Sequence, residues 1–582
     1  MNTSGLSRQS SPIFFDNNAH IAQNQNIQMY YVGSPVWRTN GQVLRPQNPQ
    51  DFEKIGNLYT QKKDLFLSSL SGHFALQINC LKTKNSLAAT DRIGVHRLFW
   101  CKSQDGSPLI STSLSALKAQ SNAGSALSPT ALYSYIYFHM IPSPLSISPD
   151  IEKLPPSHSL SFENGNIRIE PFWVPEFREH NALSIDALSE NLHSLISESV
   201  SESIGDETHF ATFLSGGLDS STVTGVACNL TDRAVDSYSI GFDAKEYDET
   251  PFARETARHF GSQHHEYYVT PEDIFSAVPK IAAAYDEPFG NSSAMPVYYC
   301  AKVAADNGVK LMLAGDGGDE LFAGNTRYAS QRHYQHYLAI PKVLRKRLFD
   351  HLINALPTKF PLATKAQNYI KQADMPLPDR MQIYNFLYRH DPLEIFDKDY
   401  LAAIDTPMPL ELLREQYNRP ENASDLNRML YLDWQFTLAD NDLRKVSSMC
   451  ELAGVDVAYP LITDRLMDFS CDIPSALKLN KGNLRYFFRY AMQEFLPQAT
   501  LKKSKHGFGL PFGVWLKDYQ PLHDLAYDSL EKLKSRHFFN PDFIDKVRHM
   551  HSSTHASYYG ELIWIMMMLE LWISSHQDNG NR

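Results

Sequence analysis

Short apolar runs, broken by turn residues, occupy the chain from Ile27 to about Phe172. Three of them have the length and residue types of strands: Phe74–Ile78, Leu87–Ala89 and Leu98–Cys101. Residues 1–28 are instead rich in Asn, Gln and Ser, which predicts a loosely ordered polar tail. The first part of the chain is therefore predicted to be a mainly β domain over residues 29–175.

A different pattern begins after a linker at 171–180 that is rich in Pro and charge. Ser184 is placed to cap a helix whose apolar residues recur at helical spacing. Strands and helices then alternate: strands at Phe210–Leu214, Tyr238–Phe242, Glu266–Val269 and Lys310–Leu313, and helices at Thr250–Phe260 and Pro271–Tyr285. This alternation predicts a parallel, doubly wound sheet.

Residues 329–575 follow with a mostly helical pattern, so a second domain is expected over 184–575, with a short tail at 576–582. The apolar run Leu562–Ile573 is too short to cross a bilayer, which takes roughly 20 apolar residues. Glu570 also interrupts it. We expect a buried helix here and no membrane insertion.

Length, charge and cysteine content favour a multidomain protein without a nucleic-acid partner. The 582 residues favour two or more domains, and a formal net charge of −11 argues against a nucleic-acid partner. The six cysteines lack CxxC spacing, and no basic n-region with an apolar stretch opens the sequence. Free thiols and a cytoplasmic location are the expectation.

The first candidate for chemistry is the loop Ser215–Ser221, which follows an apolar strand and opens a helix. Gly216 and Gly217 let the backbone approach an anion, and free N–H groups with the helix dipole favour phosphate there. Ser215, Ser220 and Ser221 add hydroxyl donors, while Asp219 would need a cation beside phosphate and so suggests Mg²⁺. The alternative is a structural Gly-Gly turn.

A second Gly-rich loop, AGDGGDELFAG at 314–324, follows the predicted strand Lys310–Leu313. Ligands of open α/β sheets bind at the carboxyl ends of the strands, so both loops are expected to meet at one rim. Asp219 and Asp319 could then share Mg²⁺ between the phosphates of ATP. The alternative for this acidic loop is a solvated turn.

With these motifs the chain resembles the asparagine synthetase family over about residues 70–575. The resemblance rests on SGGLDSS at 215–221, SIGF at 239–242, YDEPFGNSSAMP at 285–296, GDGGDELFAG at 315–324 and KHGFGLPFGVWL at 505–516. It implies a PP-loop ATP pyrophosphatase domain that adenylates a carboxylate, releases pyrophosphate and then joins the acyl group to an amine. ATP and Mg²⁺ are the implied cofactors.

The resemblance also assigns roles to individual positions. It places the adenine and ribose of ATP against Leu214, Ile240, Ala314 and Gly315. It matches Lys505 to the lysine that steadies pyrophosphate and the reacting acyl centre, and Asp316 to a Glu that acts as base toward the amine. The polar groups of the acyl substrate would be bound by Asn291, Ser292 and Ser293, which could equally form a helix cap.

The N-terminal part resembles a glutaminase (Ntn amidotransferase) sandwich that has lost its chemistry. The first residues are Met1–Asn2–Thr3–Ser4 and the first cysteine is Cys80, so the family's terminal cysteine nucleophile is not found. LSGHFAL at 70–76 and ATDRIGVHRLFW at 89–100 survive, which indicates structural roles for Asp91 and Arg92. Ala458 and Thr463 stand where relatives often have Arg and Asp, which suggests a substrate other than free aspartate.

Three enzyme hypotheses remain open, together with a non-catalytic scaffold. In the first, the amine belongs to a peptide, as in the lasso-peptide macrolactam synthetases, which share YFHMIPSP at 137–144 and LRKVSSMCELAGVDV at 443–457. A precursor peptide and its protease would then be partners. The second makes asparagine from free ammonia, and the third closes a small ring as β-lactam synthetases do. The intact residues Asp319 and Lys505 argue against a scaffold.

Overall fold

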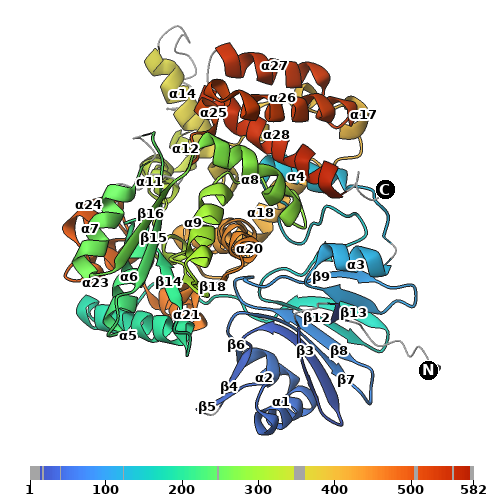
Figure 1. Cartoon of the computed structure of the whole chain (residues 1–582), viewed down its shortest axis with the longest axis vertical. Coiled ribbons are helices and arrows are strands. Elements are labelled where there is room, and N and C mark those ends of the chain that lie inside the picture. Colours follow the sequence, from blue (N-terminus) through green and yellow to red (C-terminus); the bar gives the residue numbers. More distant parts are fainter. Residues whose placement is uncertain are drawn as a thin grey trace.

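The chain folds into two α/β units that pack side by side (Figure 1). The computed structural model describes residues 14–15, 19–39, 41–121, 123–244, 248–345, 361–503, 509–553 and 556–576. The N-terminal unit is built on mostly antiparallel sheets, and the C-terminal unit on a parallel sheet surrounded by helices. The predicted fold class is therefore confirmed.

The N-terminal unit is a sandwich of two sheets with helices on its outer face. Its largest sheet runs, in spatial order, β13 (Asn166–Pro171), β12 (His158–Glu163), β8 (Ser86–Thr90), β7 (Phe74–Cys80), β3 (Ile27–Gly33) and β2 (His20–Gln23). The second sheet contains β1 (Phe14–Phe15), β10 (Pro108–Ser111), β9 (Phe99–Lys102) and β11 (Glu152–Lys153). A small third sheet contains β5 (Gln42–Leu44), β4 (Val36–Thr39) and β6 (Leu70–Ser71).

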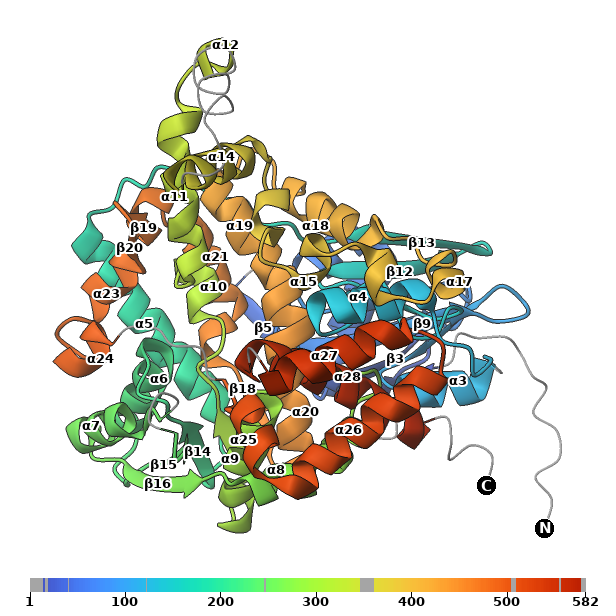
Figure 2. The same ribbon diagram turned by 90° about the horizontal axis from the view of Figure 1, so that it is seen from above.

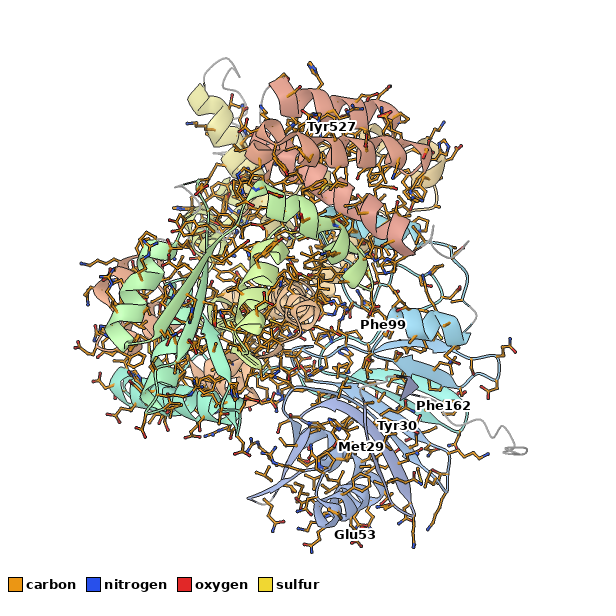
Figure 3. All side chains as sticks on the ribbon, viewed as in Figure 1. Met29, Tyr30, Glu53, Phe99, Phe162 and Tyr527 are labelled. Atoms are coloured by element: carbon orange, nitrogen blue, oxygen red, sulfur yellow. The ribbon has the colours of Figure 1, made fainter. Side chains whose placement is uncertain are left out.

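The side chains of β3 alternate between the two faces of its sheet, and both faces are covered. Met29 joins the core beneath α1 (Pro49–Gln61) and α2 (Lys63–Ser68), whereas Tyr30 packs against the core between the two sheets (both are labelled in Figure 3). Side chains of successive strand residues point to opposite faces, so the consecutive apolar residues from Met29 to Val32 can serve both cores. Two further helices, α3 (Leu114–Ser121) and α4 (Pro129–Phe138), lead toward the second unit.

The C-terminal unit contains a five-stranded, all-parallel sheet. Its spatial order is β16 (Gln263–Tyr268), β15 (Asp236–Gly241), β14 (Phe210–Phe213), β17 (Leu311–Leu313) and β18 (Asp456–Ala458). α6 (Leu218–Asn229) and α7 (Thr250–Phe260) cover one face, while α9 (Ala294–Asp306) and α20 (Leu443–Ala453) cover the other (Figure 1). The strand order reverses between β14 and β17, which is where such sheets place their ligands.

Helices make up most of the remainder. α5 (Ile185–Ile204) begins where Ser184 accepts a hydrogen bond from the Ala187 N–H at 3.2 Å, which confirms the predicted cap. α8 (Pro271–Ala284) packs with the C-terminal helices α26 (Gln520–Ser535), where Tyr527 is labelled in Figure 3, and α28 (Ala556–His576). α11 (Thr326–Leu338), α12 (Lys342–Leu344) and α14 (Pro361–Asp374) extend outward from the body of the molecule (Figure 2).

The apolar run at the end of the chain lies within α28, as predicted. Residues Leu562 to Leu569 are buried, and the carboxylate of Glu570, fully buried, accepts two hydrogen bonds from Arg536 at 2.6 and 2.8 Å. Burying Glu570 is tolerable because the guanidinium neutralises it. Within the described part of the chain, no helix is both long and apolar enough to cross a membrane.

At least three strands differ from the sequence predictions. β1 and β2 both lie inside the segment 1–28 that the sequence assigns to a polar tail, because β1 pairs with β10 and β2 pairs with β3 through backbone groups. Strand β18 lies inside the region predicted to be helical. It is three residues long, and its place beside β17 is a long-range pairing that local periodicity does not reveal.

Candidate functional site

The phosphate-type loop connects β14 to α6, as the sequence predicted. Gly216 adopts a φ of +69°, and a Cβ at this position would overlap the backbone of Phe252 and Ala253, so glycine is required. The Ser215 and Ser220 hydroxyls lie 3.1 Å apart, and Ser215 Oγ accepts from the Gly217 N–H at 3.3 Å. These bonds hold the turn in shape at the N-terminus of α6, where anions are favoured.

The second Gly-rich loop follows β17 and touches the first. A Cβ on Gly315 would lie 2.7 Å from the backbone nitrogen of Ser220, so the two loops meet at van der Waals distance. α10 (Gly318–Phe322) lies within this segment. Between the two loops, α20 and residues 482–503 lies a cavity of about 1160 Å³.

Most of the residues expected to bind ATP face this cavity. Its walls include Leu214, Ser215, Gly217, Asp219, Ser220, Ile240, Gly315, Asp316 and Asp319. Three others lie behind it: Gly216 packs on α7, Ser221 lies 3.1 Å from the Thr256 hydroxyl, and the Ala314 N–H donates to the Ala458 carbonyl at 2.9 Å. Lys505 lies outside the described residues.

Arg485 joins the two carboxylates expected to hold the metal. Its Nη1 donates to Asp219 Oδ2 at 2.7 Å and to Asp319 Oδ1 at 3.0 Å, and its Nη2 pairs with Asp219 Oδ1. The three charged groups offset one another in a site that leaves only 5% of the Arg485 side chain exposed. Two carboxylates beside a phosphate loop fit Mg²⁺, which takes one or two carboxylates and completes its shell with phosphate oxygens and water.

A second charged cluster lies deeper, around Asp316. Burial, helped by the carboxylates of Asp442 and Asp219 and opposed by the charge of Lys445, raises the pKa of Asp316 to about 6. Lys445 donates to Asp442 Oδ1 at 2.8 Å. Burial lowers the pKa of Lys445, but Asp442 and Asp316 outweigh it, so the net shift is upward and the amine stays charged. Asp316 is thus a carboxylate able to change protonation near neutral pH.

The helical segment that carries Asp442 and Lys445 contains a wider, π-helical stretch that ends at Asp442. α19 (Asp425–Asp433) runs into α20 through a π-helical stretch, Trp434–Asp442. Such stretches frequently occur at functional sites, because an added residue redirects side chains. Sequence periodicity did not reveal Asp442, Lys445 or Arg485 as site residues, since all three are far from both loops along the chain.

The loop 291–293 meets the cavity in part. Asn291 and Ser293 line it, and Asn291 Nδ2 donates to Asn441 Oδ1 at 2.8 Å. Asn291 Oδ1 also accepts from the Ser293 N–H at 3.0 Å, close to the start of α9. The polar wall is therefore compatible with this geometry. The predicted helix cap is not formed, because Ser293, the N-cap residue of α9, makes no side-chain capping hydrogen bond.

Lys503 is a cavity residue that the sequence treated as part of a basic run. Its Nζ donates to the Ser215 carbonyl at 2.9 Å and pairs with Glu249 at 3.0 Å. The side chain is 8% exposed. Lys503, two residues before Lys505, therefore stabilises the first loop through its backbone carbonyl.

Four predicted positions lie away from this cavity. Ala458 and Thr463 line a separate cleft between the two units, which Asp464 also lines. Asp91 accepts hydrogen bonds from five backbone N–H groups between Phe74 and His96, at 2.7–3.1 Å. Arg92 pairs with Asp464 and Asp468, at 3.5 and 2.8 Å. These contacts give Asp91 and Arg92 structural roles, as the sequence indicated.

A glycine-rich loop at the carboxyl end of a parallel strand, facing two carboxylates, defines a nucleotide-binding α/β protein. The family model for asparagine synthase matches residues 191–574, and that for a glutamine amidotransferase domain matches residues 38–173. The chain belongs to the asparagine synthase family.

Two relatives show the extent of the similarity. The chain is 24% identical over 525 residues to glutamine-hydrolyzing asparagine synthetase 1 of Bacillus subtilis, covering 90% of this chain and 80% of the relative. It is 30% identical over 428 residues to a putative glutamine-hydrolyzing asparagine synthetase 2 of Methanocaldococcus jannaschii, covering 72% and 79%. The chain is thus an ATP-dependent, amide-forming carbon–nitrogen ligase that produces AMP and pyrophosphate.

Proposed function

We propose that this ligase closes a peptide macrolactam: it adenylates an Asp or Glu side chain of a peptide and joins it to an amine of the same peptide. The observation that carries the proposal is the single cavity that unites the phosphate loop, the Asp219–Arg485–Asp319 cluster and the Asp316–Lys445–Asp442 cluster. The phosphate loop and the Asp219–Arg485–Asp319 cluster suit adenylyl transfer. The Asp316–Lys445–Asp442 cluster suits the second step, in which the attacking amine must lose a proton.

The residues divide the work of the two steps. A carboxylate oxygen of the substrate attacks the α-phosphorus of ATP, and pyrophosphate leaves against the N–H groups of the Ser215–Ser221 loop. Asp219 and Asp319 would hold Mg²⁺, which supplies charge neutralisation at the phosphates. The amine nitrogen then attacks the acyl carbon, AMP leaves, and Asp316 accepts the proton from nitrogen. Lys505, carried over from the family pattern, would steady the charge at the acyl centre.

An amine from the substrate, rather than from glutamine, is supported by the N-terminal unit. Cys80 ends β7 beside Thr83, and Cys101 lies buried in β9, so neither thiol faces the cleft between the units. The segments YFHMIPSP and LRKVSSMCELAGVDV, shared with lasso-peptide macrolactam synthetases, support a peptide substrate. A precursor peptide and its protease are the partners this proposal requires.

Asparagine synthesis from aspartate and ammonia is the second candidate, because the relatives are named asparagine synthetases, although their names give glutamine hydrolysis as part of the activity. Small-ring closure of the β-lactam-synthetase kind is the third. All three use the same adenylation step, and they differ in the substrate that triggers pyrophosphate release.

The decisive experiment measures ATP-dependent pyrophosphate release with three substrate sets. These are linear peptides with a free N-terminus and internal Asp or Glu residues, aspartate with ammonium, and small β-amino acids. We expect release with peptides, together with a product lighter by one water. Release with aspartate and ammonium but not with peptides would replace the proposal by asparagine synthesis.

The Asp219→Ala variant tests whether the activity comes from the described cavity. We expect it to abolish pyrophosphate release, because the carboxylate that holds the metal is lost. Asp306→Ala is the matched control, since Asp306 pairs with Lys302 on the surface at 2.7 Å. Retained activity in Asp219→Ala would remove Asp219 from the metal site, and no release with any substrate would favour a scaffold.

A further inference from the structure

A large cleft separates the N-terminal sandwich from the C-terminal unit. Its volume is about 1890 Å³, well above the roughly 300–1,000 Å³ of a small-molecule pocket. Helix α20 separates this cleft from the cavity beside the phosphate loop, called the ATP cavity below. Lys445 and Val446 line the ATP cavity. Arg444, Ser447 and Ser448, on another side of the helix, line the cleft. The cleft is therefore a neighbouring space with its own chemistry, and it has room for an extended chain.

Two arginines from different units meet in this cleft. Arg97 precedes β9 and keeps 13% of its side chain exposed, while Arg444 lies over the ring of Tyr285 with 5.5 Å to the ring centroid. Burial, followed by the charge of Arg444, lowers the pKa of Arg97 to about 10, although the carboxylates of Glu287, Asp286 and Asp440 act in the opposite direction. Two like charges held together in a partly buried place are unfavourable, and these carboxylates offset that cost only in part.

The neighbouring carboxylates already have other donors. Glu287 accepts from Lys153 Nζ at 2.7 Å and from the Ile147 N–H at 2.9 Å, and it forms a long ion pair of 3.9 Å with Arg97. Asp440 accepts from the Ser143 N–H at 2.8 Å. Asp286 accepts from the Leu114 N–H and the Ser115 hydroxyl, at 3.5 and 3.3 Å. Among the described residues, none of these three carboxylates is hydrogen-bonded to Arg97 or Arg444.

A buried hydroxyl lies one helical turn from Arg444, on the same face of α20. Ser448 is 5% exposed, lines the cleft, and its Oγ has no hydrogen-bond partner among the described residues. This hydroxyl oxygen is itself shielded from solvent, so it adds polarity to the wall beside Arg444 but is not an accessible donor. The cationic groups of this part of the cleft are the two guanidinium groups of Arg97 and Arg444.

The cleft also exposes the edge of the parallel sheet. Asp456, Val457 and Ala458 of β18 line it. On the inner side the Asp456 N–H donates to the Lys310 carbonyl and the Ala458 carbonyl accepts from the Ala314 N–H, each at 2.9 Å. Since bonding groups alternate along a strand, the N–H and carbonyl of Val457 point away from β17. An open strand edge is a template for one more strand.

We propose that this cleft docks an extended, acidic segment of the peptide substrate, with its backbone beside β18 and a glutamate or aspartate side chain between Arg97 and Arg444. This inference rests on the proposed peptide substrate. It adds that the cleft would select peptides with an acidic side chain in an extended segment. Docking there would hold the substrate on one side of α20 while its reacting groups lie on the other side, at Asp316.

The binding test uses the full chain without ATP and a fluorescein-labelled peptide of alternating valine and glutamate residues, acetylated and amidated at its ends. Fluorescence anisotropy compares it with the valine–glutamine peptide and with an N-methylated valine–glutamate peptide. We expect both changes to weaken binding about tenfold or more, because one removes the carboxylates and the other the backbone donors. Equal binding of the glutamate and glutamine peptides would overturn the proposal.

Arg444→Gln tests the arginine pair directly. We expect it to weaken the glutamate peptide about tenfold and to leave the glutamine peptide unchanged, as a double-mutant cycle requires for a direct contact. Arg465→Gln is the matched control, since Arg465 lines the same cleft but already pairs with Glu198. An unchanged affinity in Arg444→Gln would overturn the arginine assignment.

Pyrophosphate release separates this inference from the proposed function. If peptides trigger release and Arg444→Gln leaves their KM unchanged, the docking site is wrong and the macrolactam function stands. If peptides bind in an Arg444-dependent way but trigger no release, the macrolactam function is wrong and the cleft remains a peptide-binding site.

Discussion

At the scale of single residues, Arg485 sets the charge of the proposed metal site. It is placed between Asp219 and Asp319 by the left-handed backbone of its own position, with a φ of 55°, at the start of α23 (Tyr486–Met492). A guanidinium there and a divalent cation compete for the same oxygens. If Asp219 and Asp319 bind a metal ion, its affinity without ATP therefore depends on the free energy of breaking their hydrogen bonds to Arg485.

Arg485→Ala is expected to bind Mn²⁺ about tenfold more tightly in the absence of nucleotide, because two carboxylates lose their internal cation. Titration followed by electron paramagnetic resonance measures this directly and needs no turnover. Arg254→Ala provides the control, since Arg254 pairs with Glu266 on the surface at 2.6 Å. Equal Mn²⁺ affinity in Arg485→Ala and the unaltered chain would contradict the competition.

Asp316 should control the pH dependence of the second step. Its pKa of about 6 means that the carboxyl keeps its proton below that pH and can accept one above it. The rate of amide formation from a preformed acyl-adenylate should therefore rise through about pH 6. Asp316→Asn should remove this rise and slow the step by roughly 10²–10⁴-fold. Single-turnover rates across pH give the answer; a variant with an unchanged pH profile would exclude Asp316 as the base.

At the scale of elements, α10 approaches the phosphate loop so closely that it needs glycine. A Cβ on Gly318 would overlap the Asp219 carboxylate, and one on Gly324, after α10, would overlap that of Asp319. The two glycines are thus the reason that both carboxylates can turn toward Arg485. The motif GDGGDELFAG contains these glycines, but the sequence does not say which atoms they accommodate.

Gly318→Ala should displace Asp219 without unfolding the chain, because Gly318 opens a helix in which alanine is well tolerated. We expect pyrophosphate release to fall at least about tenfold while the unfolding midpoint moves little. Gly124→Ala serves as the control, since the nearest atom to its added Cβ lies 3.9 Å away. Full activity in Gly318→Ala would show that the Asp219 geometry is not limiting.

At the scale of the whole molecule, the two units are joined by buried polar contacts. Lys153 of β11 and Glu287, which follows α8, are 1% and 7% exposed and lie 2.7 Å apart. The Gly72 N–H donates to Asp464 Oδ2 at 2.7 Å, and the Tyr135 hydroxyl donates to the Ile565 carbonyl at 2.8 Å. The N-terminal sandwich is consequently a structural part of the ligase.

Lys153→Met tests this coupling. Removing one partner leaves the Glu287 charge buried, which is expected to cost about 3–5 kcal/mol. Lys302→Met, which breaks the surface pair with Asp306, should cost less than about 1 kcal/mol. Urea unfolding followed by intrinsic fluorescence compares the two midpoints. A Lys153→Met midpoint no lower than that of Lys302→Met would mean that the buried pair does not hold the units together.

The sequence alone determined the fold class and both glycine-rich loops, because strand–helix alternation and backbone requirements for glycine are local properties. It could also place Ser184 as a cap, since capping involves residues a few positions apart. Tertiary structure alone decided that Arg485 lies between Asp219 and Asp319, that Lys445 and Asp442 flank Asp316, and that β18 forms an open sheet edge. These are contacts between groups far apart along the chain, and only the packed sheet and helices bring them together.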